Sequence, residues 1–255
     1  MLWINDPHLL VAFVATLILM LFHYLSPWFT KHLPGNGKAF TSFAGGVAVA
    51  YVFIHMLPDL VEYNKPIGHF LLNNQWLTPF TELLIYIFAL VGFLIYYGFD
   101  LLAENYRLQG NNDAFVYELH LIMFCFYNFL ITYTMSLRAL SSITATVIFT
   151  FAMALHFVLT DRKFSRFYPI RFNQMGRFLL IGALFIGWIC SVIFDPVNVL
   201  VAAFMVSFLA GSILLNVFRE ELPSAKSASY WWFSFGTLII AAVLLLQTWV
   251  IVSLR

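Results

Sequence analysis

A segment of 17 residues occurs twice in this chain, at an offset of 165 residues. The first copy begins with the sequence SFAGG at Ser42 and ends at Pro58, and the second begins with SFLAG at Ser207 and ends at Pro223. Seven residues are identical over these positions without a gap. Both copies are apolar, and an odd number of predicted membrane crossings separates them, so the second crosses in the opposite direction. Such an inverted repeat is typical of membrane transporters; the alternative is that two apolar helices share small residues and a terminal proline by chance.

Composition gives the class of protein. Hydrophobic residues make up 62% of the 255 residues and charged residues only 10%, which is too little polar surface to cover a soluble globule of this length. A membrane-spanning helix needs about 20 predominantly apolar residues. Eight windows meet this requirement: roughly residues 8–29, 40–61, 80–101, 115–137, 140–161, 177–194, 197–218 and 229–253. We therefore expect an all-α polytopic membrane protein with eight transmembrane helices, in one domain over residues 1–255.

The repeat predicts how these eight helices are arranged. Matching its two copies puts the first three helices in correspondence with the last three, and leaves 115–137 and 140–161 as a central hairpin. The predicted arrangement is therefore 3+2+3. In transporters of this design the substrate site lies near the middle of the membrane, where the two halves meet.

The loop charges predict the orientation. The loops on the side of both termini hold three basic residues, Lys65, Arg138 and Arg255. The loops on the other side hold ten: Lys31, Lys38, Arg107, Arg162, Lys163, Arg166, Arg171, Arg177, Arg219 and Lys226. The positive-inside rule makes the second side cytoplasmic and places both termini outside, in a plasma membrane or bacterial inner membrane. Membrane lipid is the expected surrounding partner, and a formal net charge of +1 argues against nucleic acid.

Polar groups at membrane depth are costly and therefore point to function. Tyr127 and Asn128 fall at the middle of the fourth predicted helix. His156 and Thr160 lie one turn apart on the same face of the fifth, and Asp161 follows. The fourth and fifth helices are joined by a very short loop, so they are antiparallel neighbours and these groups can converge. Imidazole, carboxylate and amide groups together can bind a divalent cation.

Glu118 and His120 begin the fourth helix at about the depth of Asp161, which makes them candidate gate groups on the inner side. A purely structural interpretation is also open. In it, Glu118, His120 and Asp161 extend toward water at the interface, and His156 hydrogen-bonds to a neighbouring helix.

Acidic and imidazole groups also mark the ends of the repeated helices. His55 and Asp59 end the second helix on the predicted outer side, and Glu220 and Glu221 end the seventh on the inner side. One interpretation is an entry and exit funnel for cations. The other is that these residues only solvate helix ends.

The repeated segments resemble a known family. Phe43-Ala44-Gly45-Gly46-Val47 followed by His55-Met56-Leu57-Pro58-Asp59 is similar to the second helix of the ZIP (Zrt/Irt-like) divalent-metal transporters. Leu209-Ala210-Gly211 followed by Glu220-Glu221-Leu222-Pro223 resembles their seventh helix. This resemblance implies eight helices in a 3+2+3 inverted repeat, both termini outside, and a metal site in the central hairpin.

The central hairpin departs from the family pattern. The fourth-helix motif of the family, His-Asn-x-Pro-Asp-Gly, falls on residues 127–132 and keeps only Asn128. The fifth-helix motif, His-Glu-x-Pro-His-Glu, falls on residues 156–161 and keeps His156 and, conservatively, Asp161. The usual two-metal site cannot form from these residues, so the resemblance leaves His156, Asn128 and Asp161 as remnant ligands.

The resemblance implies transport of a divalent metal cation, such as zinc, iron or manganese, by alternating access. A second hypothesis is a non-transporting pseudo-transporter that keeps the fold as a membrane scaffold or binding subunit, and a third is transport of a less charged solute. Each of these three hypotheses is compatible with a homodimer or with a partner membrane protein. Enzymatic activity is not expected, because the chain has no membrane-embedded Ser/His pair, no acids at protease-like spacing and no cofactor motif.

Overall fold

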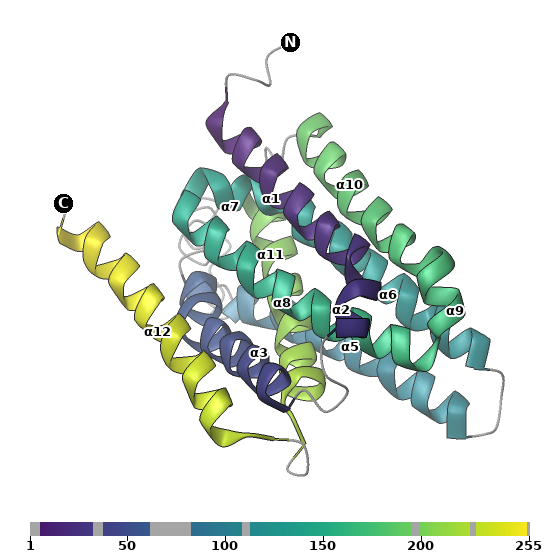
Figure 1. The fold of residues 1–255 in the computed structure, drawn as a ribbon. Helices are drawn as coiled ribbons and strands as arrows, with labels where there is room; N and C mark the ends of the chain where they lie inside the picture. Colours follow the sequence, from purple (N-terminus) through teal and green to yellow (C-terminus); the bar gives the residue numbers. More distant parts are fainter. Residues whose placement is uncertain are drawn as a thin grey trace.

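The part of the chain that the structure describes is almost wholly helical (Figure 1). The computed structural model describes residues 6–32, 38–61, 83–108, 113–194, 199–224 and 228–253, and it contains no β-strand within these ranges. The helices are α1 (Pro7–Tyr24), α2 (Ser26–His32), α3 (Lys38–Tyr51), α5 (Leu84–Leu108), α6 (Asp113–Tyr133), α7 (Met135–Ser141), α8 (Ile143–Phe167), α9 (Pro169–Arg171), α10 (Arg177–Ile193), α11 (Val199–Asn216) and α12 (Tyr230–Ser253). Three π-helical segments are also described, η1 (Val52–Met56), η3 (Phe172–Gly176) and η4 (Val217–Glu221). After η1 the helix continues over residues 57–61.

Seven described helical segments are long and apolar enough to cross a membrane, which confirms the predicted helical class. They are Pro7–Tyr24, Lys38–Val61, Leu84–Tyr106, Ala114–Ser141, Ile143–Phe167, Pro169–Ile193 and Tyr230–Trp249. Ala203–Arg219 is a further apolar helix, shorter than these. Such lengths fit a multi-pass membrane protein, because a helix satisfies its own backbone hydrogen bonds within lipid.

Two helices extend well beyond their predicted ends. The fifth predicted helix was expected over 140–161, but α8 continues to Phe167, and α9 begins immediately after at Pro169. Much of the basic stretch predicted as a loop is therefore helical. Proline is tolerated in the first turn of a helix, where its missing N–H has no partner to lose. Similarly, α5 runs to Leu108 rather than ending near residue 101. A search for apolar windows does not detect these helix ends, because the last turns of α5 and α8 carry charged side chains.

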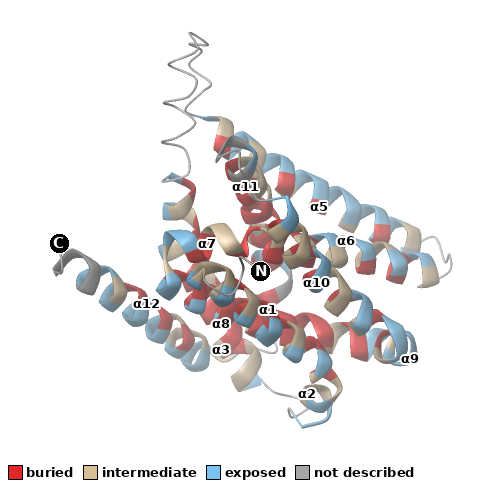
Figure 2. Ribbon diagram, turned by 90° about the horizontal axis from the view of Figure 1, so that it is seen from above, coloured by how far each residue is buried: buried red, intermediate tan, exposed pale blue. Residues whose placement is uncertain are grey.

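The centre of the bundle is α8. In its most apolar window 72% of the residues are buried, against 17% in the corresponding windows of α5 and α12. Figure 2 shows the same contrast, with buried residues concentrated on α8 and exposed residues along α5 and α12. The outer helices carry many exposed aliphatic and aromatic side chains. Their apolar outer faces suit contact with lipid rather than water.

The two ends of the bundle are distinct. In Figure 1, the start of α1, the short helix α7 and the end of α12 lie at the same end of the bundle, toward the left, and we call this the α7 end. At the opposite end of the bundle, α8 ends and α10 begins, and we call this the α9 end. The most extensive helix pairings are α3 with α12, α5 with α11 and α6 with α10.

Glycines set the closest of these approaches. A Cβ atom added to Gly46 of α3 would lie 2.1 Å from the backbone oxygen of Phe233 in α12. A Cβ atom on Gly211 of α11 would lie 1.7 Å from the backbone oxygen of Ala89 in α5. No side chain larger than hydrogen fits at either position. Gly46 and Gly211 are equivalent residues of the repeat, so equivalent glycines bring α3 and α11 against α12 and α5.

The partner helices α12 and α5 also use glycines to approach a backbone carbonyl group of α3 and α11. A Cβ atom on Gly236 of α12 would lie 2.2 Å from the oxygen of Phe43, and one on Gly92 of α5 would lie 2.2 Å from the oxygen of Phe208. Phe43 and Phe208 are again equivalent residues of the repeat. The pairs α3–α12 and α11–α5 therefore pack through matching sets of glycine and carbonyl contacts.

The π-helical segments η1 and η4 occupy equivalent positions in the two copies of the repeat. The segment η1 covers Val52–Met56 and η4 covers Val217–Glu221, which are equivalent positions of the two copies. A π-helical segment places an extra residue in the turn and rotates the side chains that follow it. Both copies of the repeat therefore carry this rotation at the same place.

Candidate functional site

A chain of three polar side chains joins α1, α6 and α8 in the core. His23 Nδ1 lies 2.9 Å from Asp161 Oδ2, and Asn128 Nδ2 lies 2.9 Å from His23 Nε2. The carboxylate fixes the imidazole, because Nδ1–H donates to Asp161 and leaves Nε2 to accept a hydrogen bond from Asn128. All three side chains are almost fully buried. Asn128 and Asp161, both predicted site residues, are thus joined through a histidine of α1.

A second buried pair lies on the other side of α8. His156 Nδ1 contacts Glu221 Oε1 of η4, and each side chain is only 2% exposed. With Nδ1–H donated to the carboxylate, Nε2 of His156 carries the lone pair, and it has no hydrogen-bond partner in the described part of the chain. A carboxylate that orients one ring nitrogen while the other remains available is the arrangement in which histidine binds metal ions.

Four buried polar atoms of these two groups have no hydrogen-bond partner among the described residues. They are Asp161 Oδ1, Asn128 Oδ1, His156 Nε2 and Glu221 Oε2. Each unsatisfied buried atom costs about 1–3 kcal/mol. All four are oxygen or imidazole nitrogen atoms, the types that bind zinc, iron and manganese. In the described part of the chain, however, no three His, Cys, Asp or Glu side chains group closely enough to hold a metal ion.

Aromatic rings enclose both histidines. The ring of Phe157 stacks on His23 at a centroid distance of 4.2 Å, and the ring of Tyr127 lies 5.6 Å from that of His156. The Tyr127 hydroxyl is buried and donates to Met153 Sδ at 3.7 Å. Tyr127 therefore packs against the His156–Glu221 pair.

A cavity of about 320 Å³ opens toward the α9 end, between α5, α6, α8 and the end of α11. Thr160 and Asn216, both only 7% exposed, are part of its lining. Nδ2 of Asn216 has no hydrogen-bond partner in the described structure. Thr160 lies one turn beyond His156 on the same face of α8. The cavity therefore reaches to within one helical turn of the buried His156–Glu221 pair.

Charges of both signs line this cavity. Asp100 of α5 forms an ion pair with Arg219 of η4, and His120 Nε2 lies 3.5 Å from Asp100 Oδ1. Glu104 and Lys163 add one charge of each sign. Of the two predicted gate groups, His120 therefore lines the cavity. Glu118 is exposed on α6 and does not line it.

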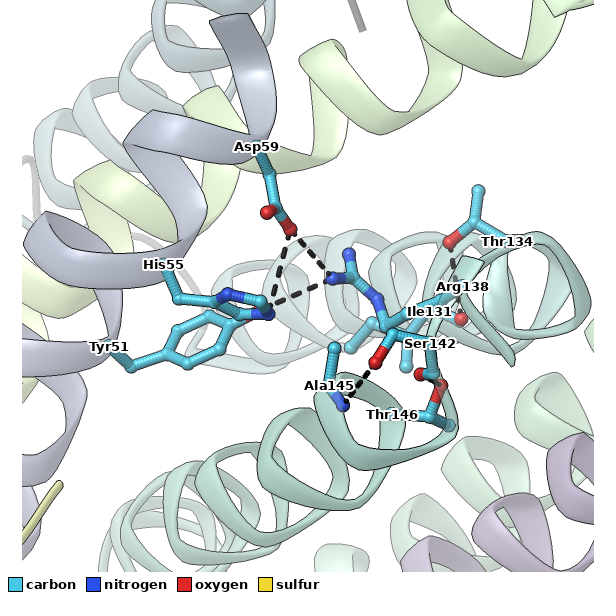
Figure 3. Close-up of polar contacts among 9 residues, drawn as sticks. All are labelled: Tyr51, His55, Asp59, Ile131, Thr134, Arg138, Ser142, Ala145 and Thr146. Carbon is cyan, nitrogen blue, oxygen red and sulfur yellow. Dashed lines mark hydrogen bonds and ion pairs between the residues drawn. The ribbon is translucent and has the colours of Figure 1, made fainter. Parts of the chain in front are cut away.

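A compact ionic cluster lies at the α7 end (Figure 3). Arg138 Nη1 donates to Asp59 Oδ2 at 3.3 Å and lies 3.5 Å from the Tyr51 hydroxyl. His55 Nε2 lies 3.6 Å from the same Asp59 oxygen. The Arg138 guanidinium also lies 4.1 Å above the ring centre of Phe149 in α8. The cluster ties the end of the α3–η1 helix to α7 and α8.

His23 and Arg138 are among the network residues that the sequence patterns do not single out. His23 lies in a long run without formal charge, and only a search for histidines within apolar runs would have singled it out. Arg138 was counted as an outer loop residue, yet it is only 7% exposed. The four residues predicted at the ends of the repeated helices lie in different surroundings. Glu221 contacts His156 in the core, and His55 and Asp59 lie close together at the α7 end. The side chain of Glu220 lies outside the described residues.

Comparison of the chain with protein families, curated proteins and solved structures finds no match in any of the three.

Proposed function

We propose that this chain is a ZIP-like membrane transporter that moves a divalent metal cation by alternating access. The proposal combines the resemblance of its two repeated helices to that family with one observation in the core. The Glu221 carboxylate orients His156 and leaves the Nε2 lone pair available in a buried site. Such a carboxylate–histidine pair is how proteins prepare an imidazole to bind a divalent cation.

The proposed architecture is an eight-helix 3+2+3 inverted repeat. Its support is that equivalent glycines, carbonyl groups and π-helical segments recur at the same offset of 165 residues. In this arrangement α1, α3 and α5 correspond to α10, α11 and α12, and α6 and α8 form the central hairpin. The α11–η4 helix is then the additional crossing that brings the seven long spans to eight, and it is the seventh in chain order. In such transporters one half moves against the other around a central site.

Equivalent positions of the repeat have different surroundings at the two ends. Tyr51 is buried beneath the Arg138 cluster at the α7 end, whereas its equivalent, Asn216, lines the cavity at the α9 end. One end therefore carries an ionic cluster that ties the helices together, and the other has a cavity leading toward His156. We propose that the cluster closes the α7 end in this state. Alternating access predicts this asymmetry, with exchange of the two environments in the opposite state.

A non-transporting pseudo-transporter is the second candidate. The described residues contain no group of three or more candidate metal ligands, and the cavity lining holds matched positive and negative charges rather than an acidic surface. A membrane scaffold or binding subunit needs the fold but no cargo site.

The proposed setting is a plasma membrane or bacterial inner membrane, with both termini outside. Lipid is the proposed neighbour of α5 and α12, whose outer faces are apolar. A groove of about 440 Å³ between α1 and α8 is lined almost wholly by apolar side chains and suits a lipid acyl chain. A homodimer or a partner membrane protein remains part of the proposal for the scaffold.

Uptake into liposomes that contain the purified chain distinguishes the two candidates. Zinc, iron(II) and manganese(II) are offered separately, and the wild-type chain is expected to take up at least one of them faster than empty liposomes. Glu221→Gln removes the carboxylate that orients His156, and it is expected to lower uptake by about 10–100-fold, as for other partners of metal-binding histidines. Glu118→Gln, an exposed acid on α6, is the matched control and should transport normally. Uptake no faster than in empty liposomes for all three metals would favour the scaffold.

A further inference from the structure

Arg138 is an unusual residue for the end of a transmembrane hairpin, because its cationic side chain is almost entirely buried. It is 7% exposed, and it approaches Asp59, Tyr51 and the ring of Phe149 together. A buried cation is tolerated only where a counter-ion and polar or aromatic groups replace its water shell. The surrounding residues therefore form a site that favours a positive charge (Figure 3).

The same site contains an imidazole nitrogen, Nε2 of His55, which faces the Asp59 carboxylate and the Arg138 guanidinium (Figure 3). His55 precedes Asp59 by four residues, and its Nε2 lies 3.6 Å from Asp59 Oδ2. This nitrogen is buried and has no hydrogen-bond partner in the described part of the chain. An imidazole and a carboxylate four residues apart on one helix face can bind one divalent cation together.

We propose that His55 and Asp59 form a divalent-cation site at the α7 end, and that the Arg138 guanidinium holds the place of the cation in this structure. The guanidinium and a metal ion compete for the same carboxylate, and their like charges exclude joint occupancy. Entry of a cation therefore requires Arg138 to leave, which opens the contact between the α3–η1 helix and the central hairpin. The site lies at the opposite end of the bundle from the cavity, is separate from the His156–Glu221 pair, and requires no transport.

Zinc titration of the purified full-length chain, stripped of metal and followed by calorimetry, tests this site directly. Arg138→Gln removes the competing charge but keeps a polar side chain of similar reach. It is expected to bind one zinc ion more than the wild-type chain, with an affinity at least tenfold higher than any zinc binding at this end of the wild type. Arg138→Lys, which keeps the charge, is the matched control and should show no additional zinc ion.

The double variant Arg138→Gln/Asp59→Asn is expected to lose the additional zinc ion, since the carboxylate is one of its two ligands. The proposal is wrong if folded Arg138→Gln binds no more zinc than the wild type, or if the gain survives in the double variant. If Arg138→Gln does not fold, Phe149→Leu takes its place, because it removes the ring beneath the guanidinium and keeps the charge. A smaller gain in zinc affinity is then expected, and unchanged zinc binding in folded Phe149→Leu would overturn the proposal. Zinc uptake plays no part in these measurements, so they are independent of the transport assay.

Discussion

Gly211→Ala is expected to destabilise the protein through a clash between α11 and α5. The added Cβ atom would lie 1.7 Å from the Ala89 oxygen, whereas real Cβ atoms essentially never approach closer than 3.0 Å. The two helices therefore have to separate by roughly 1.3 Å, since the obstructing atom belongs to the backbone and cannot rotate away. Overpacking of this kind typically costs about 1–3 kcal/mol. At about 2–4 °C per kcal/mol for a chain of this length, the midpoint of thermal unfolding should fall by about 2–12 °C.

The assay is thermal unfolding in detergent, followed by tryptophan fluorescence. Gly98→Ala and Gly182→Ala are matched controls, because a Cβ atom at either position meets nothing within 4 Å. Alanine also has the higher helix propensity, by about 1 kcal/mol, so these two variants should be at least as stable as the wild type. Gly46→Ala should behave like Gly211→Ala, since the two glycines occupy equivalent positions. The reasoning fails if Gly211→Ala unfolds at the same temperature as the controls.

Two further variants test the core network and the open cavity. His23→Ala leaves the buried Asp161 carboxylate without its hydrogen-bond donor, and it should lower the free energy of unfolding by about 3–5 kcal/mol in an SDS titration; a loss below about 1 kcal/mol would argue against this buried contact. In a background with Cys125 and Cys190 replaced by serine, Asn216→Cys should react with a small membrane-impermeant thiol reagent added on the α9 side and remain protected from the α7 side. Equal reaction from both sides would contradict a closed α7 end.

Much of the architecture could be predicted from local sequence. Apolar run lengths report membrane-spanning helices directly, because each helix satisfies its own backbone in lipid. The repeated glycines at 46 and 211 were also informative, since close helix approach requires small residues. His156, Asn128 and Asp161 were singled out because polar groups are rare in apolar runs, and all three are buried in polar contacts.

The partners of these groups could not be predicted, because they come from distant parts of the chain. His23 lies 138 residues from Asp161, and Glu221 lies 65 residues from His156. Glu221 looked like a solvated helix end, but the π-helical turn of η4 rotates its side chain into the core, and hydrophobic periodicity carries no sign of that turn. The burial of Arg138 was equally hidden, since a single basic residue in a short connection usually faces water.

The most direct test of the inverted repeat is the side of the membrane that each copy reaches. Single cysteines replace Val61, which follows the first copy, and Ser224, which follows the second, in a chain with Cys125 and Cys190 changed to serine. Both positions are exposed in the structure. In oriented vesicles, an impermeant maleimide should label the two cysteines from opposite faces of the membrane. Labelling of both from the same face would contradict the inverted repeat.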